Sequence, residues 1–388
     1  MKGIYFSGKM EKIIIIGVTH HNTLTMVRCL GKAGYKIQLY IYGDKNSYIR
    51  YSKYVTEYVG TDTCDEVFDI LLSQKEKIGY KPIVISCCDE VAHLFDLNYD
   101  NLKDSYFFFN CGEQGRMTHY MDKQVQVKLA ESCGLTVPKS MVKEEGDDTV
   151  EFNVYPCICK PLCSIAGLKS QICICHNQVE LNHGLKSFGK SARVQVQEFV
   201  KREYEIVVVG LNVNGETFIP GFIRKNRDRM GGTTYATIYP ITKLPQSVTE
   251  SVKKFIECVH YEGLFGMELI VSNDKYYFVE TNLRNDATTF AFSVAGVNLA
   301  LAYVKAKRGE EYHSEVSKVL QQINSMVELT DITHVMKFHV GLLQWLKDRK
   351  GCKSLYFYDK DDMKPYTLAK QQFVMGYVKR ILHKFHIQ

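Results

Sequence analysis

At 388 residues the chain is long enough for two or three domains, each with its own hydrophobic core. A hydrophobic content of 45% and a charged content of 24% are ordinary for a soluble globular protein, and no apolar run approaches the length of a membrane span. The formal net charge of +6 suits anionic ligands but is too small to indicate a nucleic-acid-binding protein.

The first part of the chain alternates strands and helices. Apolar runs predict strands at residues 12–18, 35–42, 55–59 and 82–86, and helical spacing predicts helices at residues 22–32 and 65–73. This βαβ rhythm is typical of a parallel sheet covered by helices. The turn after the first strand, from Gly17 to His21, lacks the G-x-G-x-x-G fingerprint, so we expect no dinucleotide site there. His20 and His21 either cap the next helix or contact a substrate at the strand end.

The middle of the chain is a mixed α+β region. Helices are predicted at residues 122–133 and 248–259, and strands at residues 157–160, 172–175, 194–200, 204–211 and 218–223. Lys160 ends one of these strands and precedes a turn of small residues. Such a position can present a charge and backbone N–H groups to phosphates. The alternative interpretation is an exposed lysine at a strand end.

Four polar residues share one face of a predicted hairpin. Its two strand-like runs are residues 265–270 and 277–284, with turn residues between them. Glu280, Asn282 and Arg284 lie two apart and therefore project together, and Glu268 can face them from the paired strand. Their oxygen atoms suit Mg²⁺, and the guanidinium suits a phosphate or carboxylate oxygen. The alternative is a solvated strand face with a salt bridge.

The chain contains 13 cysteines, an odd number, and several lie inside apolar strand-like runs. Residues 1–11 are short and polar, and the apolar run at residues 13–16 is too brief for a signal peptide. We therefore expect reduced, buried thiols in a cytoplasmic protein. The pairs Cys157-x-Cys159 and Cys173-x-Cys175 offer a rival zinc site. They lack the usual C-x-x-C spacing, so we interpret them as packed thiols on one strand face.

The hairpin motif, a Glu followed by Glu-x-Asn-x-Arg, resembles the metal-binding hairpin of the ATP-grasp superfamily. That superfamily includes biotin carboxylase, carbamoyl phosphate synthetase and D-aspartate ligase. Further motifs follow the family order: Asp122-Lys123 with Gly134 to Pro138, Lys160 with a loop from Ser164 to Gly167, and a hinge from Gln197 to Val200. The resemblance spans residues 122–284. It implies an ATP-grasp fold with an N-terminal Rossmann-like domain, that is, an α/β part joined to an α+β part.

The resemblance also implies roles for individual residues. Lys123, Lys160, Ser164 and Gly167 would bind the phosphates of ATP. The hinge residues Gln197, Glu198, Phe199 and Val200 would hold adenine, with Ile270 stacked under it. Glu203 or Glu205 would bind the ribose, because the spacing here is one residue short of the common pattern. Glu268, Glu280 and Asn282 would bind one or two Mg²⁺ ions, with Mn²⁺ as the alternative metal, and Arg284 would stabilise the transferring phosphoryl group.

The implied activity is an ATP- and Mg²⁺-dependent carboxylate–amine ligase that works through an acylphosphate. We expect an amino acid or sugar acid as acceptor, in surface-polysaccharide or cell-wall biosynthesis, and a homodimer as in many ATP-grasp ligases. Arg227 and the Gly231-Gly232 backbone, in a basic and then glycine-rich stretch, would clamp a substrate; the alternative is a solvated basic loop. The alternative functions are a carbamoyl phosphate synthetase-like carboxylate kinase and an ATP-binding scaffold without catalysis.

The predicted organisation has four parts: residues 1–115, 116–200, 201–310 and 311–388. They correspond to the N-terminal domain, the lid, the subdomain with the metal site and a C-terminal extension. Residues 364–388 mix basic and apolar side chains, which suits peripheral contact with an anionic membrane surface. A helix docked on the core with a solvated basic face is the alternative, and it is the one we expect.

Overall fold

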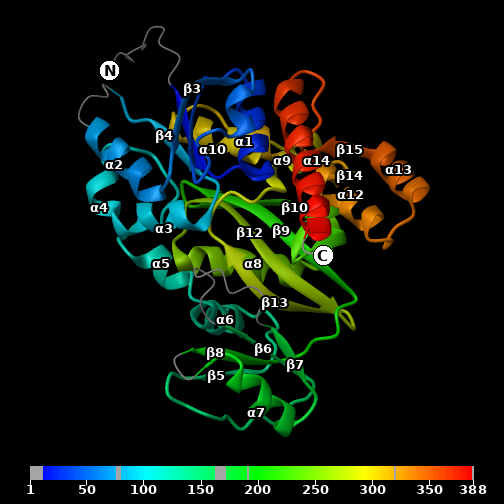
Figure 1. Ribbon diagram of the computed structural model, residues 1–388. Coiled ribbons are helices and arrows are strands. Elements are labelled where there is room, and N and C mark those ends of the chain that lie inside the picture. The colour runs from blue at the N-terminus through cyan, green and yellow to red at the C-terminus, as the bar shows by residue number, and fades with distance from the viewer. Residues whose placement is uncertain (1–11, 76–79, 162–171, 190–191, 319, 387–388) are drawn as a thin grey trace.

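The computed structural model describes residues 12–75, 80–161, 172–189, 192–318 and 320–386. Three sheets organise these residues (Figure 1). In the figure the N-terminal sheet lies at the top, a seven-stranded sheet lies in the middle, and a small four-stranded sheet lies at the bottom. The predicted combination of an α/β part and an α+β part is confirmed.

The N-terminal sheet is parallel and has the strand order β3-β2-β1-β4. Its strands are β1 (Ile13–Gly17), β2 (Ile37–Tyr42), β3 (Val55–Thr61) and β4 (Ile83–Ser86). The helices of this part are α1 (His21–Lys32), α2 (Cys64–Gln74), α3 (Asp89–Leu97), α4 (Tyr99–Leu102) and α5 (Arg116–Tyr120), with the 3₁₀ turn η1 (Tyr48–Tyr51). Every residue of β1 is buried, as expected for a central parallel strand that helices cover on both faces. The predicted strands and the helices at 22–32 and 65–73 are confirmed.

The small sheet is antiparallel, with the strand order β5-β8-β6-β7. Its strands are β5 (Ser140–Lys143), β6 (Cys157–Pro161), β7 (Cys173–Cys175) and β8 (Val194–Glu198). Helix α6 (Lys123–Ser132) precedes the sheet, and α7 (Gln178–Lys186) covers it with Leu181 and Leu185 in a separate small core. From here on we use the name lid for the described residues between 140 and 198, which are the part of the predicted segment 116–200 that forms this sheet. Because its core is its own, the lid is built as a separate layer below the large sheet.

The large sheet has the order β13-β12-β9-β10-β11-β14-β15. Its strands are β9 (Tyr204–Val213), β10 (Glu216–Arg229), β11 (Gly232–Pro240), β12 (Gly263–Ser272), β13 (Lys275–Asn282), β14 (Ile323–Met326) and β15 (Cys352–Leu355). The 3₁₀ turn η2 (Ile241–Lys243) leads into α8 (Gln246–Val259), whose Phe255 packs on Phe278 of β13 at 5.7 Å between ring centroids. One face of the sheet is thereby covered by α8, which leaves the other face to the candidate site.

The basic stretch at residues 224–229, for which we considered a loop, is part of strand β10. The strand predicted at residues 218–223 continues to Arg229 and pairs with β11. Met230 and Gly231 form the turn between them, with φ values of 51° and 81°. Gly231 adopts this left-handed conformation without the steric cost that a side chain adds. The stretch is therefore a hairpin with alternating side-chain directions, which a loop would not impose.

The C-terminal part packs on the N-terminal domain and on the large sheet. Its helices are α9 (Thr289–Val294), α10 (Leu299–Lys307), α11 (His313–Val316), α12 (Glu328–Met336), α13 (Leu342–Gly351) and α14 (Met363–His386). Strands β14 and β15, from the segment predicted as an extension, complete the edge of the large sheet. Arg28 of α1 has 0% exposure and donates to Asp362 at 3.0 Å and to the carbonyls of Tyr356 and Phe357. These contacts fix the C-terminal part to the N-terminal domain. Among the described residues, no helix has the length and apolar character needed to cross a membrane.

Candidate active site

Glu268 and Glu280 lie directly opposite each other on neighbouring antiparallel strands. The register shifts by one residue between this pair and the pair of Leu269 with Phe278, so Val279 forms a β-bulge. Without that extra residue Glu280 would pair with Met267 and project toward α8. The bulge therefore brings both carboxylates to the face that α8 leaves uncovered.

The other two hairpin residues complete this face. Asn282 lies opposite Gly266, two residues along from Glu280. The Arg284 guanidinium donates to the Asn282 Oδ1 atom at 3.1 Å. The structure thus brings together the two carboxylates, the amide and the guanidinium, as the sequence pattern predicted. We call Glu268, Glu280 and Asn282 the oxygen cluster.

Two lysines bring positive charge to the oxygen cluster. The Lys123 Nζ atom, in the first turn of α6, lies 3.4 Å from a Glu280 carboxylate oxygen. The Lys225 Nζ atom lies 2.8 Å from Glu268 and 2.9 Å from Glu205. Lys225 is missing from the residues predicted from the sequence. The signal that identifies it is its position two residues after Ile223 on β10, which becomes apparent only when the strand is extended through the basic stretch.

Burial and charge set the protonation of this face. Burial raises the pKa of Glu268, and the neighbouring Glu280 charge acts in the same direction, whereas Lys225 opposes both. For Lys225 itself burial opposes the charge, but Glu268 and Glu205 outweigh it and raise its pKa. Burial also disfavours the charged form of Glu205, yet Lys225 and Arg202 lower its pKa. Lys225 is therefore held in its charged form between Glu268 and Glu205, and it offsets part of the negative charge of these two carboxylates.

Lys160 points from the lid toward the same region. Its Nζ atom donates to the Gln197 side chain at 3.0 Å, and burial together with the Lys123 charge lowers its pKa to about 8. Gln195 pairs with Lys160 in the sheet register, so both project on one lid face. The buried Gln195 Oε1 atom has no hydrogen-bond partner within the described part of the chain. A bound nucleotide would supply what both side chains lack. Its donor groups could satisfy the Gln195 oxygen, and its negative charge could stabilise the charged form of Lys160.

Residues predicted for the base and ribose lie at the lid border. The Phe199 N–H donates to the Pro156 carbonyl at 2.9 Å, and the Glu198 N–H to the Lys139 carbonyl at 2.8 Å. Glu203 is exposed and accepts from the Asn273 N–H at the β12–β13 turn. Glu205 instead lies opposite Ile270, on the face of the oxygen cluster. Ser164 and Gly167, predicted for the phosphate loop, lie outside the described residues.

Arg284 joins the oxygen cluster to the N-terminal sheet. Its Nε atom lies 2.9 Å from an Asp89 oxygen at the start of α3. His20 is the N-cap of α1 and accepts from the Asn22 N–H at 3.2 Å, which confirms the helix-capping interpretation. Burial, with the Arg284 charge, lowers the His20 pKa to about 4, so this imidazole is neutral at pH 7. A small ligand at the strand ends would meet the Arg284 guanidinium, the carboxylates of Asp89 and Asp286 that pair with it, and the neutral His20 imidazole.

Arg227 is not part of this assembly. Its guanidinium binds Asp331 at 2.7 Å and Asp348 at 2.6 Å, and it stacks on the Tyr235 ring at 4.3 Å from the centroid. Those two aspartates come from α12 and α13, far along the chain. The structure therefore places Arg227 in a contact with the C-terminal part, and its catalytic role stays a prediction.

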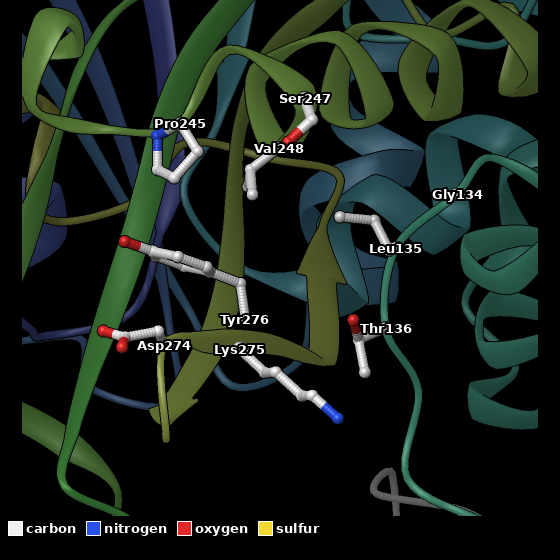
Figure 2. A pocket seen from close by; sticks show the side chains of 9 residues that line it. All are labelled: Gly134, Leu135, Thr136, Pro245, Ser247, Val248, Asp274, Lys275 and Tyr276. Atoms are coloured by element: carbon white, nitrogen blue, oxygen red, sulfur yellow. The ribbon is translucent and has the colours of Figure 1, made fainter.

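A pocket of about 220 Å³ lies on the opposite side of the β12–β13 hairpin (Figure 2). It is lined by residues 134–136 in the segment after α6, by the start of α8 and by the hairpin turn, with Thr136, Val248 and Tyr276 among the lining residues. Tyr276 shares the α8 face with Phe278, because the two lie two residues apart on β13. None of the residues of the oxygen cluster lines this pocket, so we do not assign the chemistry to it.

Comparisons with known proteins agree with this geometry. The family described as carbamoyl-phosphate synthase L chain, ATP binding domain, matches residues 117–314. A formate-dependent phosphoribosylglycinamide formyltransferase of Wolinella succinogenes is 29% identical over 140 residues, so the match spans only 34% of each protein. N5-carboxyaminoimidazole synthetase from Staphylococcus aureus, solved with ADP, has a TM-score of 0.63 at 15% identity and 85% coverage of both chains. L-amino acid ligase from Bacillus licheniformis has a TM-score of 0.61 at 12% identity, covering 82% of this chain and 80% of that one.

Proposed function

The chain belongs to the carbamoyl-phosphate synthase L chain ATP-binding family, whose match covers half of it, and we propose that it is an ATP- and Mg²⁺-dependent carboxylate–amine ligase. Its ATP-grasp fold is the architecture of the solved ligases. The observation that carries the proposal is the pairing of Glu268 with Glu280 across the bulge at Val279. The bulge turns both carboxylates to one partly open face, where Lys225 and Lys123 offset part of their charge and oxygen ligands remain for a divalent cation.

The oxygen cluster supplies the donor set for Mg²⁺, namely the carboxylates of Glu268 and Glu280 and the Asn282 amide oxygen. The metal would neutralise charge on the β- and γ-phosphates. The Lys123 Nζ atom lies near Glu280 and can turn to a phosphate when a cation takes its place. Lys160 would gain a partner for its buried charge, which restores its ordinary pKa.

The reaction has two steps. A carboxylate oxygen attacks the γ-phosphorus, and ADP leaves with the electron pair of the broken bond. An amine nitrogen then attacks the acyl carbon of the acylphosphate, and inorganic phosphate leaves as the amine gives up a proton. Arg284 would stabilise the negative charge that develops near the transferring group, because its guanidinium contacts the Asn282 ligand. Asp89 holds that guanidinium in place.

For the substrates, the acid would bind between Arg284 and the capped start of α1. Arg28, about two turns along α1, is buried against Asp362 and is therefore not assigned to the acid. We propose an amino acid or sugar acid as acceptor, within surface-polysaccharide or cell-wall synthesis. The name of the Wolinella succinogenes relative adds formate and phosphoribosylglycinamide to the acids and amines worth testing.

The test is phosphate release from ATP and Mg²⁺ across a panel of acids with and without amines, with products read by mass spectrometry. The ligase predicts ADP, phosphate and a condensed product only when both partners are present. A carboxylate kinase would instead release ADP and an acylphosphate without any amine. ATP turnover that is the same with every acid and amine, and the same in Glu280→Gln, would contradict the proposal.

A further inference from the structure

Four cysteines share one face of the hairpin that carries Lys160. Strands β6 and β7 are antiparallel, and their register pairs Cys157 with Cys175 and Cys159 with Cys173. Residues two apart on a strand project to the same face. The two C-x-C runs, separate in the sequence, therefore form one group of four thiols.

These thiols converge within the lid core. The sulfur atoms of Cys157, Cys159 and Cys175 all lie within 4.8 Å of one another, and these three residues are at most 2% exposed. A zinc–sulfur bond measures about 2.3 Å, so four sulfurs around one tetrahedral ion lie about 3.8 Å apart. Small side-chain rotations would therefore bring these atoms to the separation that one ion requires.

Helix α7 packs closely over the same group because it has a glycine, Gly184, at the point of contact. A Cβ atom at Gly184 would lie 2.8 Å from the Cys173 sulfur and 3.3 Å from the Cys175 sulfur. Glycine inside a helix costs about 1 kcal/mol relative to alanine, so its presence here favours room for the sulfur atoms over helix stability. The same contacts place the sulfur atoms of the half-buried Cys173 and of Cys175 under one residue of α7, so Cys173 is the fourth thiol beside the close group of three.

We propose that Cys157, Cys159, Cys173 and Cys175 bind one thiophilic metal ion, for which zinc is the best match. Four thiolates form a closed tetrahedral set of the structural kind. Each thiol loses its proton to solvent as its sulfur binds, and no oxidant is needed. The chain lacks the C-x-x-C spacing that brings two ligands together in many zinc sites. Here the pairing of β6 with β7 brings the four cysteines together instead.

Such an ion would act behind the nucleotide face of the lid. Cys159 and Lys160 are consecutive and project to opposite faces of β6. The ion would link β6 to β7 and limit movement of the strand that presents Lys160. This site is separate from the oxygen cluster and does not depend on the proposed ligase activity.

The test is a titration of the reduced, metal-free full-length chain with cobalt(II), followed by absorption spectroscopy. We expect one equivalent of cobalt to give the bands of a tetrahedral thiolate site together with sulfur-to-metal charge transfer, and zinc to displace it. Cys173→Ser, at the half-buried position, removes one of the four thiolates and should reduce the charge-transfer intensity by about a quarter or more, with weaker cobalt binding. The matched control Cys258→Ser, at an exposed position on α8, should leave the spectrum unchanged.

A second measurement uses only the wild-type chain, so its result does not depend on whether a cysteine variant folds. X-ray absorption at the zinc edge of the loaded wild-type chain should show about four sulfur neighbours at about 2.3 Å. A first shell made mainly of oxygen or nitrogen would overturn the proposal. So would the absence of thiolate bands in the cobalt titration, or equal bands in Cys173→Ser and the wild type.

Discussion

Two hairpins of the large sheet, β12–β13 and β10–β11, use their charged residues in opposite ways. In β12–β13 the carboxylates of Glu268 and Glu280 lie side by side and keep 23% and 33% of their side chains exposed. In β10–β11 the Arg227 guanidinium is bound by Asp331, which is fully buried, and by Asp348. The first hairpin holds two carboxylates side by side, with lysines beside them, at a partly accessible face, and the second pairs one guanidinium with two aspartates at a packed face.

The contrast shows why charge alone does not identify a site. The buried pairs of Arg227 hold the C-terminal part on the large sheet. Removal of one partner would leave the other as a buried charge without compensation, which lowers stability. Glu268 and Glu280 have lysine partners in Lys225 and Lys123, but they also lie side by side in reach of solvent, where a divalent cation can bind both carboxylates. Lys225 links the two hairpins, because it extends from β10 to Glu268 on β12.

The largest expected effect is that of metal removal. Excess chelator should reduce ATP turnover to background, because the carboxylates of the oxygen cluster would then face the phosphates without a divalent cation between the negative charges. Addition of Mg²⁺ should restore activity, with Mn²⁺ as the second ion to test. Turnover that persists in chelator would show that β12–β13 has no metal-dependent role.

Next in size is Glu280→Gln. We expect turnover to fall by about 100-fold or more, because one ligand loses its charge at the reacting phosphates. The side chain is partly exposed and the substitution keeps its shape, so the unfolding free energy should change by less than about 0.5 kcal/mol. Steady-state kinetics and urea unfolding measure both quantities. Glu257→Gln, at an exposed site on α8, is the matched control and should change neither.

Arg227→Met should have the opposite effects on stability and turnover. Loss of this guanidinium leaves the buried Asp331 without its strongest partner, which should lower the unfolding free energy by about 3 kcal/mol. Turnover per folded molecule should stay close to that of the wild type. Urea unfolding with kinetics corrected for the folded fraction tests both. A loss of turnover as large as in Glu280→Gln would instead return Arg227 to the catalytic site.

The smallest effect separates Glu203 from Glu205. Glu205 lies on the face of the oxygen cluster, so Glu205→Gln should weaken ATP binding by about tenfold through loss of one charged hydrogen bond. Glu203→Gln should leave ATP binding unchanged, since Glu203 contacts the hairpin turn. Equilibrium titration with a non-hydrolysable ATP analogue measures both variants. The reverse order would assign the ribose to Glu203.

Local pattern was enough to predict most strands and the order of the site motifs. The strands around Glu268 and Glu280 follow from alternating apolar residues, and the predicted meeting of Asn282 with Arg284 needs only the two-residue period. The bulge at Val279 could not be predicted, because its cause lies in how β13 packs on α8 and β12. Periodicity predicts which residues share a face of the strand, but a bulge moves every residue beyond it to the other face.

Long-range partners were beyond local pattern. Arg227 meets Asp331 and Asp348 at separations of 104 and 121 residues, and Arg28 meets Asp362 at 334. Nothing near a basic residue in the sequence indicates which distant acid it will bind. The C-terminal strands β14 and β15 have four residues each, too few for a periodic signal, and they form because the edge of the large sheet offers them a partner.

The central claim is that this chain uses the oxygen cluster to transfer the γ-phosphoryl group of ATP to a carboxylate. The most direct measurement supplies the acid with heavy oxygen in its carboxylate, together with ATP, Mg²⁺ and the amine. We predict that one labelled oxygen appears in the released phosphate, and that the transfer is lost in Glu280→Gln. Phosphate without the label, formed as fast in Glu280→Gln as in the wild type, would contradict the claim.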